Sequence, residues 1–318
     1  MTEQPNQSVG CIGPMGLDVL VAAVARKGEG QISQEAGITV CPGGVSRNVA
    51  ENLARLGVPV SLFTSRVSGD LGTYLAEETK AAGVAVVVRP DWEMELSSYC
   101  AWLLSDGEVE SDAADYGAVE SAFGAGFLDP LSDAVAQHTF LVSNSDISDK
   151  ALDQIVHLSE RHGSSLCLLP ASVAGCNRLR RRIGHATVMV LSAREAETMM
   201  QRTIARTDEA MHCCESIVSE GVRGLAVITL GRTGAVYACP DGRATHLSCP
   251  DLGRDVISTV GGGDALAAGV LCSLLRGSSS EEAVRFGLAA AAIAVRTSRT
   301  CAKELSLESC QAIVSTSW

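Results

Sequence analysis

The sequence predicts an α/β fold: a three-layer, doubly wound, mostly parallel sheet, with a small second β-sheet acting as a lid at one end. Two observations support this prediction. Short apolar runs alternate with segments of helical periodicity along most of the chain, which is typical of parallel strands joined by helices. Two segments, near residues 23–40 and 96–112, break this rhythm with polar alternation and a hairpin pattern, and we expect them to form the lid.

The length and composition indicate one large domain. The chain has 318 residues, of which 46% are apolar and 4% aromatic, so a core of mainly alanine, valine and leucine can form. We expect the domain to span residues 9–314. The twelve cysteines are scattered without a C-x-x-C pair, so free buried thiols are expected rather than metal ligands.

The charge pattern argues against several classes of partner. The formal net charge is −12, and no basic run could follow a nucleic-acid backbone, which disfavours a nucleic acid polymer or an anionic membrane surface. No window of 18 residues is continuously apolar, and the polar amino terminus lacks the core of a signal peptide. We therefore expect a soluble cytoplasmic protein.

The predicted elements of the first third follow the βα alternation. A buried strand at residues 10–21 is interrupted by a Gly-Pro turn and contains Asp18. A helix follows Gly44 and ends at Gly57, because apolar residues recur at helical spacing between them. The later elements expected here are a strand at 58–64, a helix at 70–82, a strand at 84–88 and a hairpin at 97–109.

The rest of the chain resumes the same rhythm. Four buried strands are expected, at 140–143, 165–169, 187–191 and 225–229. The expected helices lie at about 149–162, 193–201 and 207–220, and a second hairpin spans 236–248. Two helices close the chain, one beginning at Asp264 and one at 281–295 that is so rich in alanine that it should be almost wholly buried.

The segment Gly261–Asp264 carries the strongest local indication of chemistry. Three glycines precede an acid and an apolar helix, and free backbone amides at such a helix start favour a bound anion. An acid there would repel a phosphate unless it accepts a proton from a hydroxyl that attacks the phosphate. Taken alone, the segment fits equally well an ordinary strand-to-helix turn capped by Asp264.

Three glycine-containing segments in order resemble the ribokinase-like (pfkB) family of carbohydrate kinases. They are Gly43–Gly44 with Asn48, Thr229–Gly234, and the segment that ends at Asp264. The likeness covers roughly residues 9–314. Within the family, three stretches are most similar to pseudouridine kinases: Pro42–Asn48, Ser97–Tyr99 with Asp106–Glu108, and Glu281–Gly287.

The resemblance implies an ATP- and Mg²⁺-dependent kinase, with K⁺ as a further candidate cation, that phosphorylates the 5′-hydroxyl of a ribosyl compound. Pseudouridine, giving pseudouridine 5′-phosphate, is the first candidate substrate, and family members often dimerise through the lid, so a homodimer is expected.

The resemblance also implies roles for individual residues. Asp264 would be the catalytic base, and Gly261, Gly262 and Gly263 would stabilise the transferred phosphoryl group with backbone amides. The residues implied to hold the substrate are Asp18, Gly43, Gly44 and Asn48 at the ribose and Asp115 at the base. Those implied at the nucleotide are Ser192, Thr229, Gly231 and Gly234, with Glu195 organising Mg²⁺ through water.

Five positions depart from the family pattern, mostly on the nucleotide and metal side. Ser258 replaces Asp or Asn, Val260 replaces Thr and Gly262 replaces Ala. Ser192 replaces the Asn of an Asn-x-x-Glu motif, and Leu169 replaces an acid before Pro170. We therefore expect a working but divergent kinase with weakened or altered nucleotide use.

Alternatives stay open at this point. A kinase for ribose, another nucleoside or another small sugar fits the same signatures, and so does a catalytically weakened ligand-binding relative. A nicotinamide-dependent enzyme is disfavoured, because no G-x-G-x-x-G follows the first strand. Individually, Asp18 fits a turn cap, Glu195 a solvated helix face and Asp115 an ordinary loop acid.

Overall fold

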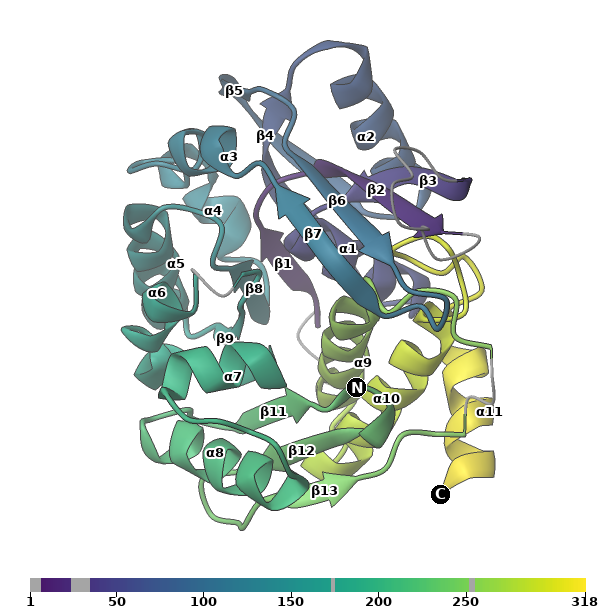
Figure 1. Ribbon diagram of the computed structural model, residues 1–318. Helices are drawn as coiled ribbons and strands as arrows, with labels where there is room; N and C mark the ends of the chain where they lie inside the picture. The colour runs from purple at the N-terminus through teal and green to yellow at the C-terminus, as the bar shows by residue number, and fades with distance from the viewer. Residues whose placement is uncertain (1–6, 24–34, 173–174, 252–254) are drawn as a thin grey trace.

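The computed structural model describes residues 7–23, 35–172, 175–251 and 255–318. A nine-stranded sheet with the order β13-β12-β11-β10-β9-β8-β1-β4-β5 forms the body of the molecule (Figure 1). Its pairings are parallel from β5 to β11, and β12 and β13 add an antiparallel edge. Its strands are β1 (Val9–Ile12), β4 (Val60–Val67), β5 (Ala85–Met94), β8 (Phe140–Asn144), β9 (Ser165–Leu169), β10 (Val188–Ser192), β11 (Leu225–Thr229), β12 (Ala235–Ala238) and β13 (Thr245–Leu247).

Two groups of helices pack on this sheet. One group joins α1 (Val45–Arg55), α9 (Gly262–Leu275) and α10 (Ser280–Ala294), in which α9 contacts both of the other helices. The other includes α5 (Asp149–His162), α7 (Ala193–Met200) and α8 (Thr207–Ser219), which pack on β8 to β12. The remaining helices are α2 (Gly69–Ala81), α3 (Gly117–Ala122), α4 (Ser132–Val135), α6 (Cys176–Arg180) and α11 (Leu307–Ser317), with short 3₁₀ turns at Asp129–Leu131, Ile183–His185 and Gly231–Thr233.

A separate four-stranded sheet lies over one end of the main sheet (Figure 1). Its order is β3-β2-β6-β7, formed by β2 (Gly16–Ala23), β3 (Ala36–Gly43), β6 (Ser98–Leu103) and β7 (Val109–Ala114). β2 pairs parallel with β6, and the other two pairings are antiparallel. This is the small sheet that the sequence predicts, although residues 24–34 of its first predicted segment lie outside the described residues.

Helix α9 is held close to α10 by two facing glycines. A β-carbon added at Gly269 would lie 2.8 Å from the Cα of Gly287, and one added at Gly287 would lie 2.8 Å from the carbonyl oxygen of Leu266. Larger side chains at this crossing would force the helices apart. The alanine-rich α10 is buried over most of its length, as predicted, with only its first turn largely exposed. The packing fixes where α9 begins, and therefore where Asp264 lies.

The predicted alternation of strands and helices is confirmed, with two differences. The single strand predicted at residues 10–21 is two strands, because the chain leaves the main sheet after β1, turns at Gly13–Pro14 and enters the small sheet as β2. Helix α11 and the short helices were not expected from the sequence. Only Cys310 of α11 is buried. A helix that buries so little needs no strong apolar periodicity, which is the signal by which helices are predicted.

Two predictions about side chains and membranes can be compared with the structure. All twelve cysteines are free thiols, most of them buried, as expected. Within the described ranges, no helix combines the length and the apolar character needed to span a bilayer.

Candidate active site

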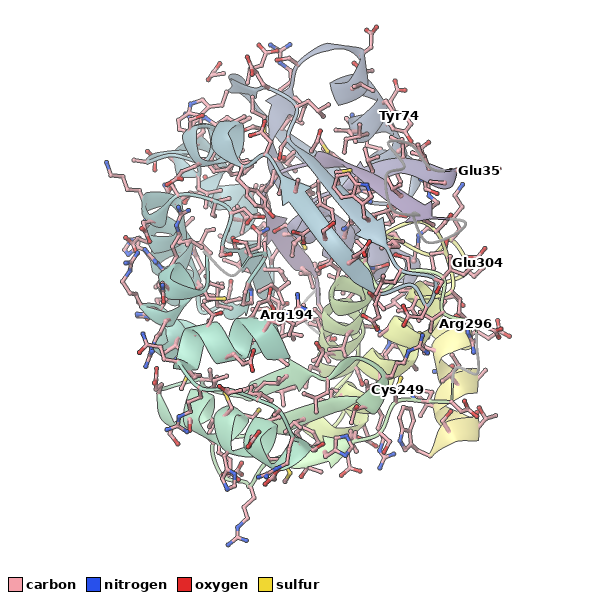
Figure 2. The ribbon with its side chains drawn as sticks, in the orientation of Figure 1. Glu35, Tyr74, Arg194, Cys249, Arg296 and Glu304 are labelled. Atoms are coloured by element: carbon pink, nitrogen blue, oxygen red, sulfur yellow. The ribbon has the colours of Figure 1, made fainter. Side chains whose placement is uncertain are left out.

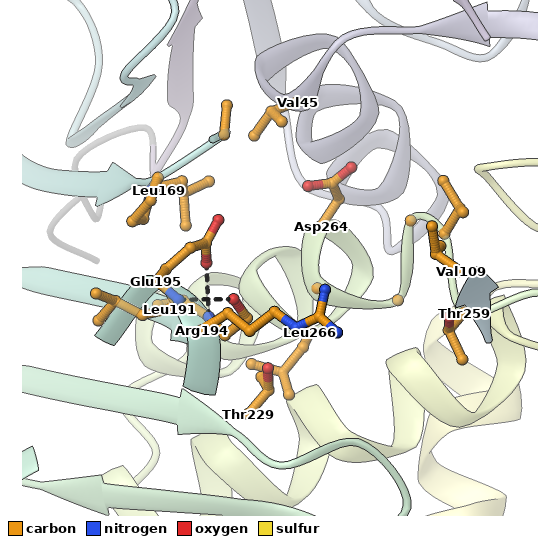
Figure 3. A pocket seen from close by; sticks show the side chains of 18 of the residues that line it. Val45, Val109, Leu169, Leu191, Arg194, Glu195, Thr229, Thr259, Asp264 and Leu266 are labelled. Carbon is orange, nitrogen blue, oxygen red and sulfur yellow. Dashed lines mark hydrogen bonds between the residues drawn. The ribbon is translucent and has the colours of Figure 1, made fainter. Parts of the chain in front are cut away.

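A cavity of about 1160 Å³ opens between the two sheets. Its walls come from the carboxyl ends of parallel strands, from the inner face of the small sheet and from the start of α9 (Figure 3). Ligands of open α/β sheets bind at this edge, because loops from several strands converge there. The sequence-predicted residues that line it are Asp18, Gly44, Asn48, Ser192, Glu195, Thr229, Gly231, Gly234, Gly261, Gly262, Gly263 and Asp264.

Asp264 lies in the first turn of α9, and its side chain faces the cavity (Figure 3). Its Oδ2 accepts a hydrogen bond of 2.9 Å from Nδ2 of Asn48 in α1. Burial raises the pKa of Asp264 to about 7; the Asn48 hydrogen bond opposes this rise, and the nearby carboxylates of Asp18, Glu195 and Asp146 add to it. The group is therefore poised to exchange a proton near neutral pH.

The glycines before Asp264 build an anion-binding turn. Gly261 adopts φ 85°, and a β-carbon there would overlap the carbonyl of Thr300, so glycine is required by both conformation and space. The Gly262 amide donates to the carbonyl oxygen of Thr259 at 3.2 Å. The amides of Gly263 and Asp264 donate to no other group in the described ranges. These two N–H groups, at the positive end of the α9 dipole, are available to a phosphate oxygen.

The substrate side is formed where β2 meets the start of α1. Asp18 is buried in β2, and burial raises its pKa to about 7 against the opposing charge of Arg47. Gly43 does not line the cavity itself, but a β-carbon there would overlap the carboxylate of Asp18. Gly44 adopts φ 99°, and a β-carbon there would lie 2.6 Å from the carbonyl oxygen of Pro14. Gly43 therefore makes room for the carboxylate of Asp18, and Gly44 allows the close approach of the Pro14 backbone.

A buried arginine that sequence reasoning missed sets the orientation of Asn48. Arg47 forms an ion pair with Glu51 one turn later in α1, and its Nη1 donates to Oδ1 of Asn48 at 3.2 Å. Because Arg47 occupies the amide oxygen, the amide nitrogen of Asn48 is left to donate to Asp264. The one available signal was an arginine four residues before a glutamate in α1, the spacing of an ion pair within a helix.

On the opposite wall, Ser192 and Glu195 form a capping box at the start of α7. The Ser192 amide donates to Glu195 Oε2 at 2.7 Å, and the Glu195 amide donates to Ser192 Oγ at 3.3 Å (Figure 3). Burial raises the pKa of Glu195, and the hydrogen bonds from Ser192 oppose the rise. Glu195 therefore faces the cavity rather than a solvated helix surface, and one of its oxygens serves as a cap.

The structure does not bring Asp115 to the cavity. Its side chain is exposed, and Oδ1 accepts from the Gly117 amide at 3.1 Å, which closes a turn before α3. Its neighbours Asp112 and Tyr116 line the cavity instead. The chain leaves β7 at Ala114, so the period-two pattern of that strand does not extend to Asp115.

Asp146 is a further cavity acid that the sequence analysis did not single out. It follows β8, is 9% exposed, and its Oδ2 accepts from Asn144 Nδ2 at 3.1 Å. Its Oδ1 is buried and has no partner among the described residues. Burial raises its pKa to about 7, the charge of Arg178 opposes this, and Glu195 adds to it. The signal that could have found it is an acid just after the carboxyl end of a predicted parallel strand.

The hairpin between β6 and β7 reaches the glycine turn. The amide of Thr259 donates to the carbonyl oxygen of Gly107 at 2.9 Å, and Arg232 Nη2 donates to that of Asp106 at 3.0 Å. Val260 packs with the small-sheet cluster of Leu20, Ala101 and Leu103. The small sheet is thus in contact with the phosphate side of the cavity.

Two of the departures from the family pattern have local structural roles. Val260 supplies the apolar contact to the small sheet just described. Ser258 is fully buried, and its hydroxyl accepts from the Val260 amide at 3.2 Å, so it shapes the turn before Gly261.

Comparison with known proteins agrees with this geometry. The chain is 27% identical to pseudouridine kinase of Escherichia coli over 273 residues, 85% of each protein. It is 26% identical to guanosine-inosine kinase of Exiguobacterium acetylicum over 264 residues, which are 80% of this chain and 84% of that protein. The solved structure of Arabidopsis thaliana ribokinase complexed with ribose and ATP shares the fold, with a TM-score of 0.79 at 19% identity over 97% of this chain and 98% of that one.

The family assignment rests on the length of the match as well as on the site. The pfkB family of carbohydrate kinases matches residues 6–306, which include both sheets and every segment that lines the cavity. The chain therefore belongs to the pfkB family of carbohydrate kinases.

Proposed function

We propose that this protein transfers the γ-phosphoryl group of ATP to the 5′-hydroxyl of a ribosyl compound, with pseudouridine as the favoured substrate. The observation that supports this most directly is the part-buried hydrogen bond between Asn48 and Asp264 beside two free helix amides. It places a proton acceptor next to an anion site in one cavity. The similarity to a pseudouridine kinase favours that nucleoside.

Each group of residues in the cavity has a different chemical role in this proposal. Asp18 and Asn48 hold the ribose hydroxyls, since a carboxylate accepts and an amide both donates and accepts hydrogen bonds. Asp264 takes the proton of the 5′-hydroxyl as the oxygen attacks the phosphorus. The amides of Gly263 and Asp264 stabilise the charge that spreads over the transferred group. Thr229, Gly231 and Gly234 face the nucleotide. The contact of Asp115 with the base stays a prediction.

The donor set fits Mg²⁺ bound together with a nucleotide. Asp146 has an unpartnered oxygen, and Glu195 has one oxygen outside the capping box. Among the described residues no three His, Cys, Asp or Glu side chains converge as a protein-only metal site. Mg²⁺ suits this arrangement, because it keeps waters and binds through one or two carboxylates plus phosphates. When bound, it would neutralise phosphate charge, with Glu195 and Asp146 as its protein-side acceptors, through water.

A purine nucleoside is the second candidate substrate. The similarity to a guanosine-inosine kinase is as extensive as that to the pseudouridine kinase. The ribose-side residues would be the same, so only the contacts with the base distinguish the two.

A phosphorylation screen tests the proposed activity. Purified protein with MgATP should convert pseudouridine to its 5′-phosphate faster than guanosine, inosine, ribose or fructose 6-phosphate, as measured by product mass and ADP release. Removal of Mg²⁺ with EDTA should abolish turnover, and K⁺ should support a higher rate than Na⁺. If no compound is phosphorylated while pseudouridine raises the melting temperature, the chain is a ligand-binding relative.

Asp264→Asn tests the catalytic base. The amide cannot accept the proton, so kcat should fall by about 10²- to 10⁴-fold. Nucleoside binding, measured by calorimetry, should persist, because most ribose contacts remain. Asp133→Asn, the same change at an exposed acid away from the cavity, is the control and should leave kcat unchanged. Wild-type turnover in the Asp264 variant would contradict the assignment.

The raised pKa of Asp264 predicts the pH dependence. A base must be deprotonated, so with a pKa of about 7 the value of kcat/KM should fall below neutral pH, by about 10-fold for each pH unit once Asp264 is mostly protonated. Asp18 and Asp146 also titrate near 7 and can steepen the fall. The free energy of unfolding should change with pH in the opposite direction to kcat/KM. Because the pKa of Asp264 in the folded protein exceeds the ordinary carboxyl value of 3.8, the free energy of unfolding should decrease as pH rises from about 4 to about 7. A flat rate profile between these values would contradict the prediction.

We also propose that the protein forms a homodimer through the outer face of the small sheet. Strand pairing places Val21, Ile38 and Trp102 in one row and Val19, Val40 and Cys100 in the next row on the same face. Of these, Ile38 is 66% and Val40 48% exposed, which is unusual for an isolated sheet face. A second copy would cover both rows.

Ile38→Glu tests the dimer. A charge in the middle of an apolar contact should convert the dimer to a monomer in sedimentation velocity, because the carboxylate would lose its hydration without gaining a partner. Trp318→Glu changes an exposed apolar residue of the C-terminal helix end and should leave the assembly state as in the wild type. A wild-type protein that sediments as a monomer at micromolar concentration would contradict the proposal.

A further inference from the structure

The charge balance of the cavity is unfavourable for a nucleoside triphosphate. Its lining includes six carboxylates, from Asp18, Glu108, Asp112, Asp146, Glu195 and Asp264. Three arginines also line it: Arg194, Arg206 and Arg232. A polyanionic ligand in this acidic space needs positive charge beyond what the helix amides of α9 supply.

Two of the three arginines are already engaged. Arg206 donates to both carboxylate oxygens of Asp208, at 2.9 and 2.8 Å, and lies 3.6 Å from Glu209. Arg232 donates through Nη2 to the carbonyl oxygen of Asp106 at the hairpin tip. Each is therefore held by a neighbour, and the charge of Arg206 is largely compensated.

Arg194 is different. Its guanidinium makes no hydrogen bond or ion pair with any residue in the described ranges, and its side chain is exposed. It projects from the start of α7 into the space between α7 and α9 (Figure 2). In the close view it extends across the cavity toward the helix that carries Asp264 (Figure 3). An unpaired cation thus lines the same cavity as the free amides of Gly263 and Asp264.

The position of Arg194 in its own helix adds a second argument. It is the second residue of α7, between the capping serine Ser192 and its partner Glu195. A cation in the first turn is destabilising, because the helix dipole is positive there. An arginine that opposes the dipole of its own helix gains no local stability, which favours a role toward a ligand.

We propose that Arg194 binds the terminal phosphates of the nucleotide, so that the transferred phosphoryl group lies between its guanidinium and the α9 amides. This rests on the proposed kinase function and deepens it by assigning a positioning contact for the phosphate chain. A guanidinium suits this task, since its planar donors match two phosphate oxygens at once.

Calorimetric binding of MgATP, MgADP, AMP and adenosine to Arg194→Ala tests the assignment. MgATP affinity should fall by about 10- to 100-fold, the effect of losing a charge-assisted hydrogen-bonding pair. Adenosine affinity should be unchanged, because adenosine carries no phosphate for the guanidinium to bind. Arg194→Lys should retain part of the MgATP affinity, since the charge remains without the bidentate geometry. The melting temperature of Arg194→Ala should equal or exceed that of the wild type.

Arg243→Ala is the matched control. It makes the same change in net charge at an exposed loop residue outside the cavity, and it should leave all four affinities unchanged. Equal MgATP affinity of wild type and Arg194→Ala would overturn the proposal, and so would an equal loss for adenosine. The phosphorylation rate of the wild type is a separate measurement, which tests the proposed function. The binding comparison tests the role of Arg194 even if no ribosyl compound is phosphorylated.

Discussion

The hydrogen bond between Asn48 and Asp264 is the contact on which the site depends. The two residues are 216 positions apart, and their side chains meet because α1 and α9 pack directly against each other. Arg47 fixes the amide of Asn48 from behind, through its own ion pair with Glu51. A buried acid thereby has one neutral donor and an open side toward the cavity, which is the environment that a general base near neutral pH requires.

Space is the second constraint, and glycines set it. At Gly43 a side chain would collide with the carboxylate of Asp18, and at Gly261 with the carbonyl of Thr300. Gly269 and Gly287 act at a distance from the ligand by letting α9 and α10 approach. The position of Asp264 therefore depends on several close approaches at once. The helix crossing sets where α9 lies, and the glycine turn sets how the chain enters it.

The electrostatics of the cavity follow from gathering several partly or fully buried acids in one space. Burial is the largest cause of the raised pKa at Asp18, Asp146 and Asp264, and nearby carboxylates add to the rise at Asp146 and Asp264. Such a site holds hydroxyl-bearing ligands well and disfavours bare anions. Phosphate therefore has to arrive with compensating charge, and the helix amides, a divalent cation and Arg194 are the sources this chain offers.

The sequence by itself determined the alternation of strands and helices, the lid hairpins, and the residues that surround Gly44 and Asp264, because periodicity and glycine turns are local properties. It could not decide that residues 10–21 divide between two sheets, that Asp115 turns away while Tyr116 faces the cavity, or that Asp146 and Arg194 belong to the site. Those outcomes depend on which strand ends and helix starts meet in space. Packing between segments far apart in the chain determines which strand ends and helix starts lie together, and a local pattern of residues does not reveal that packing.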